Sequence, residues 1–429
     1  MDTMNEMQEK AVEVIRMLVE GNYGGACGTF DATMTGALPE ARMKEYWEQL
    51  IGQVGAFQGI TAIQASEQGE ARVFILTCPF ERSTIDFRVA FNRDGQVSGL
   101  NFQIAASATP YQAPEYVRAG SFHDVEITVG SGEWALPGTL SMPEGNGPFP
   151  AVVLVHGSGP QDRDETIGPN RPFRDIAEGL ASQGIAVLRY EKRTKAHGSH
   201  FTPEIIAKLT VQEEVVDDAL AAVALLRGTP GIDPRRIYVL GHSLGGGIAP
   251  RIGQQDHTIA GLIVMAGMTR PLEDAILEQF TYLYGLAGEM SDAQKAELEQ
   301  LKVKVARVKS AELSDQTPAS DLPLGMSPAY LLDLRGYQPA EVAKALAQST
   351  RMRILVLQGG RDYQVTVAGD FPFWQRALGN ESNATLKVYP KLFHLFIEGE
   401  GPSTPQEYMK EGHVSGEVIE DMARWIEET

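Results

Sequence analysis

The feature that most constrains this chain is an apolar segment that runs directly into the pentapeptide Gly-His-Ser-Leu-Gly at residues 241–245. Residues 237–240 favour a strand, and the small apolar residues after the pentapeptide suit the start of a helix. A Gly-x-Ser-x-Gly motif between a strand and a helix is typical of a sharp turn that exposes the serine hydroxyl. Gly241 and Gly245 then stand where a Cβ atom would clash. We predict that Ser243 is a nucleophile, since a chance glycine-rich turn would not need the strand before it.

A serine nucleophile needs a base and an acid that orients the base, and two later strand ends supply candidates. Residues 352–358 read as an apolar strand, and Asp362 lies in the Gly-Gly-Arg-Asp turn after it. Residues 385–389 alternate as a second strand, and His394 lies in the loop beyond. Serine, aspartate, histidine is one of the known orders of a catalytic triad along a chain. We predict that His394 takes the serine proton and that Asp362 fixes the imidazole tautomer.

Each of these two assignments has a competitor. Asp362 could be only a turn-forming residue, because aspartate is common in turns. Asp370 is the nearest other acid, and we expect it to cap the helix predicted at 371–378. His413 is the nearest other histidine, but it lies in a polar segment with no strand before it.

An acyl-transfer site also needs backbone N–H groups that stabilise the oxyanion of the tetrahedral intermediate. One donor should be the N–H of Leu244, the residue after the nucleophile. Residues 150–155 are a continuous apolar run that predicts a buried strand, and His-Gly-Ser-Gly follows at 156–159. We assign the second donor to the backbone of Ser158, with Gly159 as the alternative, and expect His156 to brace this loop.

Strand and helix signals alternate through the part of the chain that holds these residues. The order predicts an α/β unit with a doubly wound, mostly parallel sheet, entered by an antiparallel hairpin. The segment 267–350 is far longer than one crossover helix and contains several amphipathic helical stripes. We therefore predict that 267–350 is a helical insertion. The catalytic unit as a whole is predicted at 119–429.

Several stretches of this unit resemble bacterial serine carboxylesterases of the α/β-hydrolase superfamily and, more distantly, dienelactone hydrolases and prolyl-oligopeptidase catalytic domains. They are the segments 157–168, 172–180 and 184–190 and the pair Lys192-Arg193, within a resemblance that covers about residues 120–429. The Gly-Ser-Gly-Pro-x-Asp-Arg-Asp part, beginning at Gly157, is its most specific element. Where the family usually has Tyr-Asp-Lys-Arg, this chain has glutamate at position 191.

The resemblance implies an enzyme that cleaves carboxylic esters of small to medium acyl groups through an acyl-enzyme intermediate. It also implies that the insertion is a cap over the active site. The same triad would serve a peptidase or amidase, or an acyltransferase or thioesterase, so these activities remain alternatives. An inactive hydrolase used as a binding module is disfavoured because all three parts of the constellation are present. The substrate partners would be a small-molecule ester and water, with no cofactor and no metal.

The first part of the chain, 1–105, is predicted to be a separate α+β domain, joined by a Pro- and Ala-containing linker at 106–118. An amphipathic helix carries Ala11, Val14, Ile15 and Leu18, and later alternating strands suggest a cone similar to the nuclear-transport-factor-2-like fold. No acid–base set converges there, so we expect a module for packing or for homodimer formation.

Composition narrows the partners and the compartment. The net charge of −19 disfavours nucleic acid and anionic membrane surfaces. No window is long and apolar enough for a transmembrane helix, and the acidic N-terminus is unlike a secretory signal. We therefore expect a cytoplasmic protein. Its two cysteines, Cys27 and Cys78, are expected to be free thiols rather than a disulfide.

Overall fold

The computed structural model describes residues 4–68, 71–81, 83–104, 111–286, 288–350 and 352–428. The chain divides into two compact units. The smaller consists of Met1–Pro110 with the short segments Ile167–Pro169 and Tyr408–Glu411, and the larger contains the rest. The first part of the linker predicted at 106–118 lies outside the described residues.

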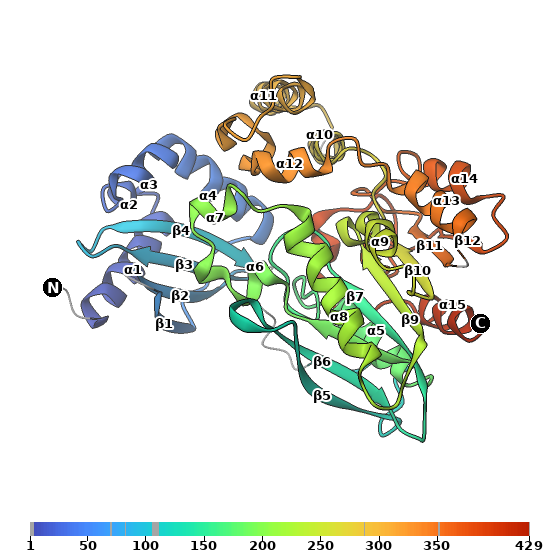
Figure 1. The fold of residues 1–429 in the computed structure, drawn as a ribbon. Helices are drawn as coiled ribbons and strands as arrows, with labels where there is room; N and C mark the ends of the chain where they lie inside the picture. Colours follow the sequence, from blue (N-terminus) through green and yellow to red (C-terminus); the bar gives the residue numbers. More distant parts are fainter. Residues whose placement is uncertain are drawn as a thin grey trace. The chain divides into compact units, whose positions relative to one another are not determined.

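The larger unit is built on an eight-stranded sheet of the order β12-β11-β10-β9-β7-β8-β6-β5 (Figure 1). All neighbouring strands are parallel except where β6 pairs with β8 and with β5. The predicted entry hairpin is therefore present, as is the mostly parallel sheet. The strands are β5 (Phe122–Val129), β6 (Leu136–Pro143), β7 (Phe149–Val155), β8 (Ala186–Tyr190), β9 (Ile232–His242), β10 (Gly261–Met265), β11 (Arg353–Gly359) and β12 (Ala384–Tyr389).

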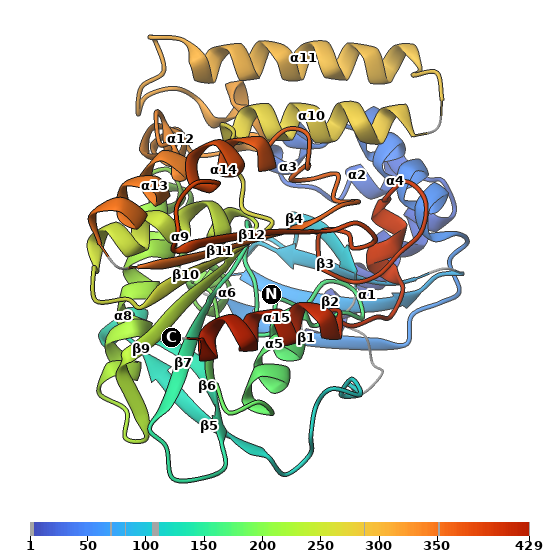
Figure 2. The same ribbon diagram turned by 90° about the vertical axis from the view of Figure 1, so that its right-hand side faces the viewer.

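Helices cover both faces of this sheet, because successive strand residues point to opposite faces. Val152 and Leu154 of β7 pack with α5 and α15 in one core. Val153 and Val155 pack with α8 and α9 in another, and α13 and α14 form a further core with β10 and β11 beside α9 (Figure 2). The helices are α5 (Pro172–Ala181), α6 (Arg193–Ala196), α7 (Pro203–Ile206), α8 (Asp217–Arg227), α9 (Leu244–Gln255), α13 (Pro339–Ser349), α14 (Phe371–Leu378) and α15 (Gly416–Glu427).

The insertion between β10 and β11 contains α10 (Leu272–Gly285), α11 (Asp292–Lys309) and α12 (Pro328–Leu334). α10 and α11 lie side by side (Figure 2). α11 begins at a capping box made by Ser291 and Gln294, and its buried residues lie on one helical face, as the sequence pattern predicts. The segment 267–350 also includes α13, which packs on the sheet because its alanines fit against Val264 and Ile354. α13 is thus the crossover helix of this βαβ unit.

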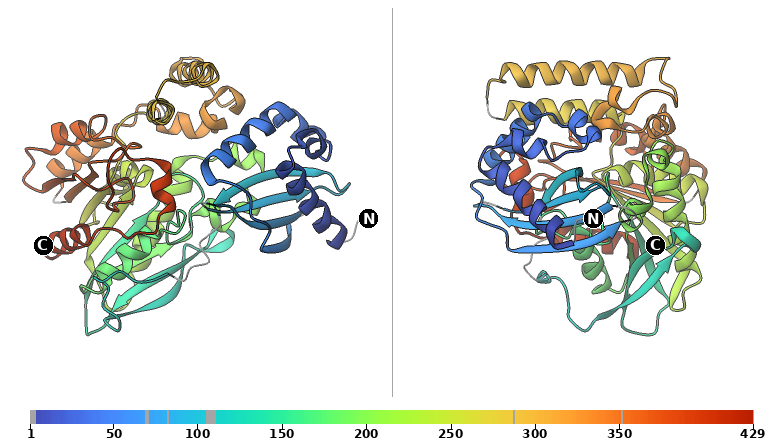
Figure 3. Two further views of the ribbon diagram at one scale, coloured as in Figure 1. Left: turned by 180° about the vertical axis from the view of Figure 1, so that it is seen from behind. Right: turned by 90° about the vertical axis from the view of Figure 1, so that its left-hand side faces the viewer.

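Among its described residues, the smaller unit combines four α-helices with a four-stranded antiparallel sheet in the order β1-β2-β3-β4 (Figure 3). The predicted apolar stripe of α1 is buried in its core, and the hairpin of β3 and β4 is formed. Cys27 and Cys78 are free thiols, and burial raises the pKa of Cys78 to about 12. The elements are α1 (Met4–Val19), α2 (Tyr23–Cys27), α3 (Ala32–Ala37), α4 (Glu40–Val54), β1 (Ala62–Gln68), β2 (Ala71–Pro79), β3 (Thr84–Phe91) and β4 (Val97–Ile104). The similarity to a nuclear-transport-factor-2-like cone and the homodimer stay predictions.

Candidate active site

The turn between β9 and α9 holds Ser243 in a strained backbone conformation, with φ 55° and ψ −117°. Non-glycine residues adopt positive φ only where the surroundings impose it. A Cβ atom at Gly241 would lie 2.1 Å from the Gly245 carbonyl oxygen, and one at Gly245 would lie 2.3 Å from the Val155 oxygen. The two motif glycines therefore allow the turn to close against itself and against β7, as predicted. The serine N–H donates to the carbonyl of Met265 at 2.9 Å.

Asp362 and His394 are joined by a buried hydrogen bond. The Nδ1 of His394 lies 2.7 Å from the Oδ2 of Asp362. The other carboxylate oxygen, Oδ1, accepts from the N–H groups of Gln364 and Val365. Asp362 therefore forms a turn and orients the histidine at once. When Nδ1 donates to the carboxylate, Nε2 of the neutral ring is left as an acceptor, which is the tautomer a general base needs.

The two competing residues are engaged elsewhere. Asp370 is fully buried and accepts from the N–H groups of Thr269 and Arg270 and from the Arg270 guanidinium. Its side chain makes no capping bond to α14, so the capping role expected for it is wrong: it anchors the start of the insertion instead. His413 pairs with Asp175, 3.0 Å away, and not with Asp362.

The loop after β7 lies directly against the nucleophile. A Cβ atom at Gly157 would lie 3.2 Å from the Ser243 Cβ atom. Among the hydrogen bonds of the described residues, none uses the N–H of Ser158. The N–H of Leu244 belongs to the first turn of α9, where amides have no partner within the helix. Ser158 and Leu244 thus lie next to Gly157 and Ser243 respectively, and their role as oxyanion donors stays a prediction.

His156 braces this loop, as the sequence suggested, and so do the residues that follow it. The Nε2–H of His156 donates to the carbonyl of Asp162 at 2.9 Å, and the Asp162 carboxylate accepts from the N–H groups of Asp164 and Thr166. Arg163 bonds with Glu126 and Glu191, and Asp164 pairs with Arg189. Burial lowers the pKa of His156 to about 4, so this ring is neutral at pH 7.

Three buried charged residues beside these segments were not identified from the sequence. The Glu165 carboxylate accepts from the Gly157 N–H at 2.8 Å, and its second oxygen lies 2.9 Å from the Nδ1 of His242. The ring Nε2–H of His242 donates to the carbonyl of His394 at 2.9 Å. The Nζ of Lys192 donates to the Gly157 carbonyl at 2.8 Å. Glu165 and Lys192 both lie in the segments that carry the family resemblance, and that was the available signal.

The Glu165–His242 contact is an ion pair rather than an aligned hydrogen bond. Burial alone would lower the pKa of His242, but the adjacent carboxylate outweighs it and the pKa is raised. Burial alone would raise the pKa of Glu165, but the imidazolium outweighs it and the pKa is lowered. His242 directly precedes Ser243 and donates to the His394 carbonyl. This pair therefore connects the turn that holds Ser243 with the loop after β12 that holds His394, here called the histidine loop.

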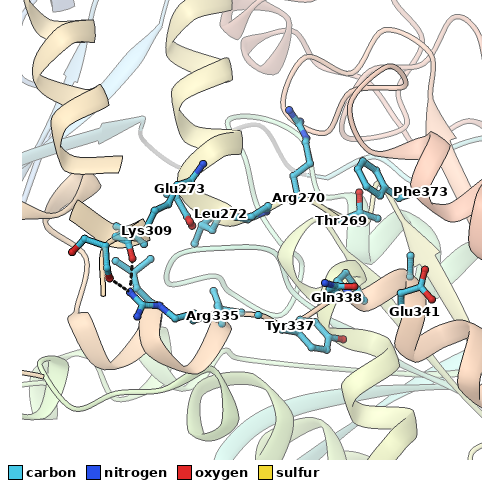
Figure 4. Close-up of a pocket in the computed structure, with 18 of the residues that line it drawn as sticks. Thr269, Arg270, Leu272, Glu273, Lys309, Arg335, Tyr337, Gln338, Glu341 and Phe373 are labelled. Atoms are coloured by element: carbon cyan, nitrogen blue, oxygen red, sulfur yellow. Dashed lines mark hydrogen bonds between the residues drawn. The ribbon is translucent and has the colours of Figure 1, made fainter. Parts of the chain in front are cut away.

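A cavity of about 610 Å³ opens between the insertion and the helices α13 and α14 (Figure 4). A smaller adjoining cavity reaches Leu244 and Ile248 of α9 and Met268, which follows β10. The residues that line both are Arg270, Pro271, Leu272, Leu334, Tyr337 and Pro339. Neither cavity is lined by Ser243 itself, so together they form a space beside the nucleophile turn, under the insertion. No three His, Cys, Asp or Glu side chains of the described residues gather as a metal site would require.

Comparison with known families places this architecture in a defined class. A family model described as serine aminopeptidase, S33, matches residues 148–400, and a model of a protein of unknown function (DUF3887) matches residues 11–100. The chain belongs to this S33 family of α/β-hydrolases. Esterase EstD of Thermotoga maritima is 40% identical over 420 residues, which cover 97% of this chain and 95% of that protein. The chain is thus a serine hydrolase of the esterase class and a homologue of EstD.

More distant relatives share part of the chain. A monoacylglycerol lipase of Mycolicibacterium smegmatis is 24% identical over 283 residues, which cover 65% of this chain and 88% of that protein. Among solved structures, an esterase of Pyrococcus furiosus superposes with a TM-score of 0.44 and 18% identity over 75% of this chain and 97% of the other. None of the helices formed by described residues is both long and apolar enough to cross a membrane.

The buried neutral His156 predicts a loss of stability in acid. Its folded pKa of about 4 lies below the ordinary 6.5, so between these values the unfolded chain binds more protons and stability falls as the pH falls. At pH 5 the contribution of His156 to the free energy of unfolding should be about 2 kcal/mol lower than at pH 7. His156→Phe keeps a ring beside Phe173 and Tyr190 but cannot titrate. In urea unfolding at pH 7 and pH 5, this variant should lose about 2 kcal/mol less than the parent. An equal loss would show that His156 is not neutral in the folded state.

Proposed function

We propose that this esterase cleaves carboxylic esters through an acyl-enzyme, with Ser243 as nucleophile, His394 as general base and acid, and Asp362 as its orienting acid. The observation that carries the proposal is the 2.7 Å bond from the His394 imidazole to Asp362. His242, the residue before Ser243, donates to the carbonyl of His394. The ring centroids of His242 and His394 lie 4.7 Å apart. These contacts bring the loop of the proposed base next to the turn of the proposed nucleophile, which supports the proposal.

The reaction proceeds in two halves. The Nε2 of His394 takes the Ser243 proton as Oγ attacks the ester carbonyl, and the oxyanion accepts from the N–H groups of Ser158 and Leu244. As the intermediate collapses, His394 gives that proton to the leaving alcohol and the acyl group stays on Ser243. Water then attacks the acyl-enzyme, His394 takes a proton from it, and the acid leaves as the proton returns to Ser243.

The insertion acts as a cap whose underside forms the acyl pocket. The cavity of about 610 Å³ is within the size range of small-molecule sites, and its smaller extension reaches Leu244, next to the nucleophile. Where the two cavities meet, the wall includes the apolar side chains of Leu272 and Leu334 and the ring of Tyr337, beside Arg270. Leu272, Tyr337 and Arg270 are labelled in Figure 4. The proposed substrates are therefore esters of small to medium acyl groups.

Two variants test the triad. Ser243→Ala should lower kcat by about 10⁴-fold or more, because the covalent route is lost. Asp362→Asn should lower kcat by about 10³- to 10⁴-fold, because an amide favours the wrong imidazole tautomer. Asp370→Asn is the matched control: it changes an equally buried carboxylate and should lower stability rather than kcat per folded enzyme. If Asp370→Asn removes activity while Asp362→Asn does not, the acid is wrongly assigned.

The preferred leaving group is tested by a panel of aryl esters from acetyl to palmitoyl, with the matching anilides and thioesters. We expect the highest kcat/KM for an ester of a small or medium acyl group. Faster turnover of an anilide would support a peptidase or amidase, and faster turnover of a thioester would support a thioesterase.

The acyl pocket is tested at Leu334, which lines both cavities. Leu334→Trp should fill the space and shift the preferred acyl chain to a shorter length, whereas Leu334→Ala should shift it to a longer one. Leu324→Ala is the control, because this leucine belongs to the same insertion and is 66% exposed. If the chain-length profile were the same in all three variants, the acyl group would bind elsewhere.

A further inference from the structure

The peptide group that joins Gly157 to Ser158 carries two functions on opposite sides. The peptide is trans and planar, so the carbonyl of Gly157 and the N–H of Ser158 point in opposite directions. The carbonyl accepts a 2.8 Å hydrogen bond from the ammonium group of Lys192. The N–H on the other side is the proposed oxyanion donor. Whatever fixes or polarises the carbonyl therefore acts on that donor.

Lys192 is buried to an unusual degree for a lysine. Its side chain is 3% exposed. Lys192 follows β8, and its side chain reaches the loop of residues 156–159 after β7, here called the oxyanion loop. Burying a cation is unfavourable unless it is paired and hydrogen-bonded. The carboxylate of Glu214 lies 3.5 Å away, but this carboxylate also accepts from Tyr330 at 2.8 Å and Thr194 at 2.9 Å. The shortest contact of the ammonium group is the one to Gly157.

We propose that Lys192 is a positioning residue that orients and polarises the Ser158 N–H for oxyanion stabilisation; this rests on the proposed esterase mechanism. The cation at the carbonyl draws electron density from the peptide nitrogen and makes its N–H a stronger donor. The same contact prevents the peptide from rotating, which would turn the N–H away from the intermediate. Both effects grow as negative charge develops on the substrate oxygen, so they favour the transition state over bound substrate.

The N–H of Gly157 is held as well, by Glu165 at 2.8 Å. Glu165 thus fixes the start of the loop, while Lys192 acts on the peptide that carries the oxyanion donor. A structural role of the Lys192–Glu214 pair alone would not need the Gly157 contact. The two roles make different predictions for variants of Lys192 and of Glu214.

The test compares Lys192→Met, Lys192→Gln and Glu214→Gln with the parent enzyme. Lys192→Met removes both charge and donor and should lower kcat/KM for a small aryl ester by about 10- to 100-fold, less than the loss of an oxyanion donor itself. Lys192→Gln keeps a neutral donor, and its kcat/KM should lie between those of Lys192→Met and the parent enzyme. Glu214→Gln keeps Lys192, and its kcat/KM should stay within about threefold of that of the parent enzyme. Active sites are counted by titration with an organophosphate, so that rates refer to folded enzyme.

Binding of two inhibitors separates oxyanion stabilisation from packing. A trifluoromethyl ketone adds to Ser243 and forms an oxyanion, so its affinity for Lys192→Met should fall by the same factor as kcat/KM. The matching secondary alcohol forms no oxyanion, and its affinity should change by less than about threefold. The double variant Lys192→Met/Glu214→Gln, which leaves no buried unpaired carboxylate, should show the same losses if Lys192→Met alone folds poorly.

Two results would overturn the proposal for Lys192. One is a kcat/KM of Lys192→Met within threefold of the parent. The other is a Glu214→Gln variant as impaired as Lys192→Met, because the ion pair would then be the important contact. The esterase mechanism fails separately, and only if Ser243→Ala retains activity or the parent does not cleave esters.

Discussion

The close approach of backbone segments around Ser243 is the constraint on which the rest of the site depends. The serine is held at positive φ, which costs on the order of 1–3 kcal/mol and persists only if the surroundings enforce it. That enforcement needs glycine at 241 and 245, where a Cβ atom would overlap neighbouring carbonyl oxygens. It also brings Gly157 against the serine Cβ atom, so the loop with the proposed oxyanion donor and the proposed nucleophile are positioned by the same packing. A substitution at any of these glycines should therefore disturb nucleophile and oxyanion donors together.

Buried charges hold these segments together, and each one serves more than one segment. The Glu165–His242 pair links the loop after β7, the nucleophile turn and the histidine loop through three contacts. Asp362 closes its own turn with one oxygen and holds His394 with the other. Replacing such groups by apolar residues could preserve folding, because buried ion pairs often add little stability. Their arrangement at the carboxyl ends of β7, β9 and β11 is better explained by the accuracy that catalysis requires.

Much of the fold and most of the candidate site could be predicted from the sequence, for physical reasons. The parallel strands are continuous apolar runs because they are buried on both faces, and each candidate residue follows such a run. The role of Asp370 was mispredicted because its partners, Thr269 and Arg270, lie about a hundred residues away along the chain. Lys192, Glu165 and His242 were missed for the same reason, since burial and pairing depend on tertiary contacts. α13 was placed in the insertion because a helix pattern alone does not tell which layer the helix joins.

The sheet and the insertion hold different parts of the proposed site, so the acyl-group preference of this enzyme can change without a change in its catalytic groups. The groups proposed to act on the ester carbonyl come from loops at strand ends. The positions of these loops are set by a core of β-branched and aliphatic residues on both sheet faces. The proposed acyl pocket is lined largely by α10, α12 and the segment leading into α13. Changes at Leu334 or Leu272 should therefore alter which acyl group binds without moving the oxyanion donors. One direct link between the two regions is Tyr330 of α12, which donates to Glu214 beside Lys192. Another is Gln279 of α10, whose side chain donates to the carbonyl of Gln364, two residues after Asp362. Contacts of α10 and α12 with the loops at the strand ends therefore fix the walls of the proposed acyl pocket relative to the groups proposed to act on the ester carbonyl.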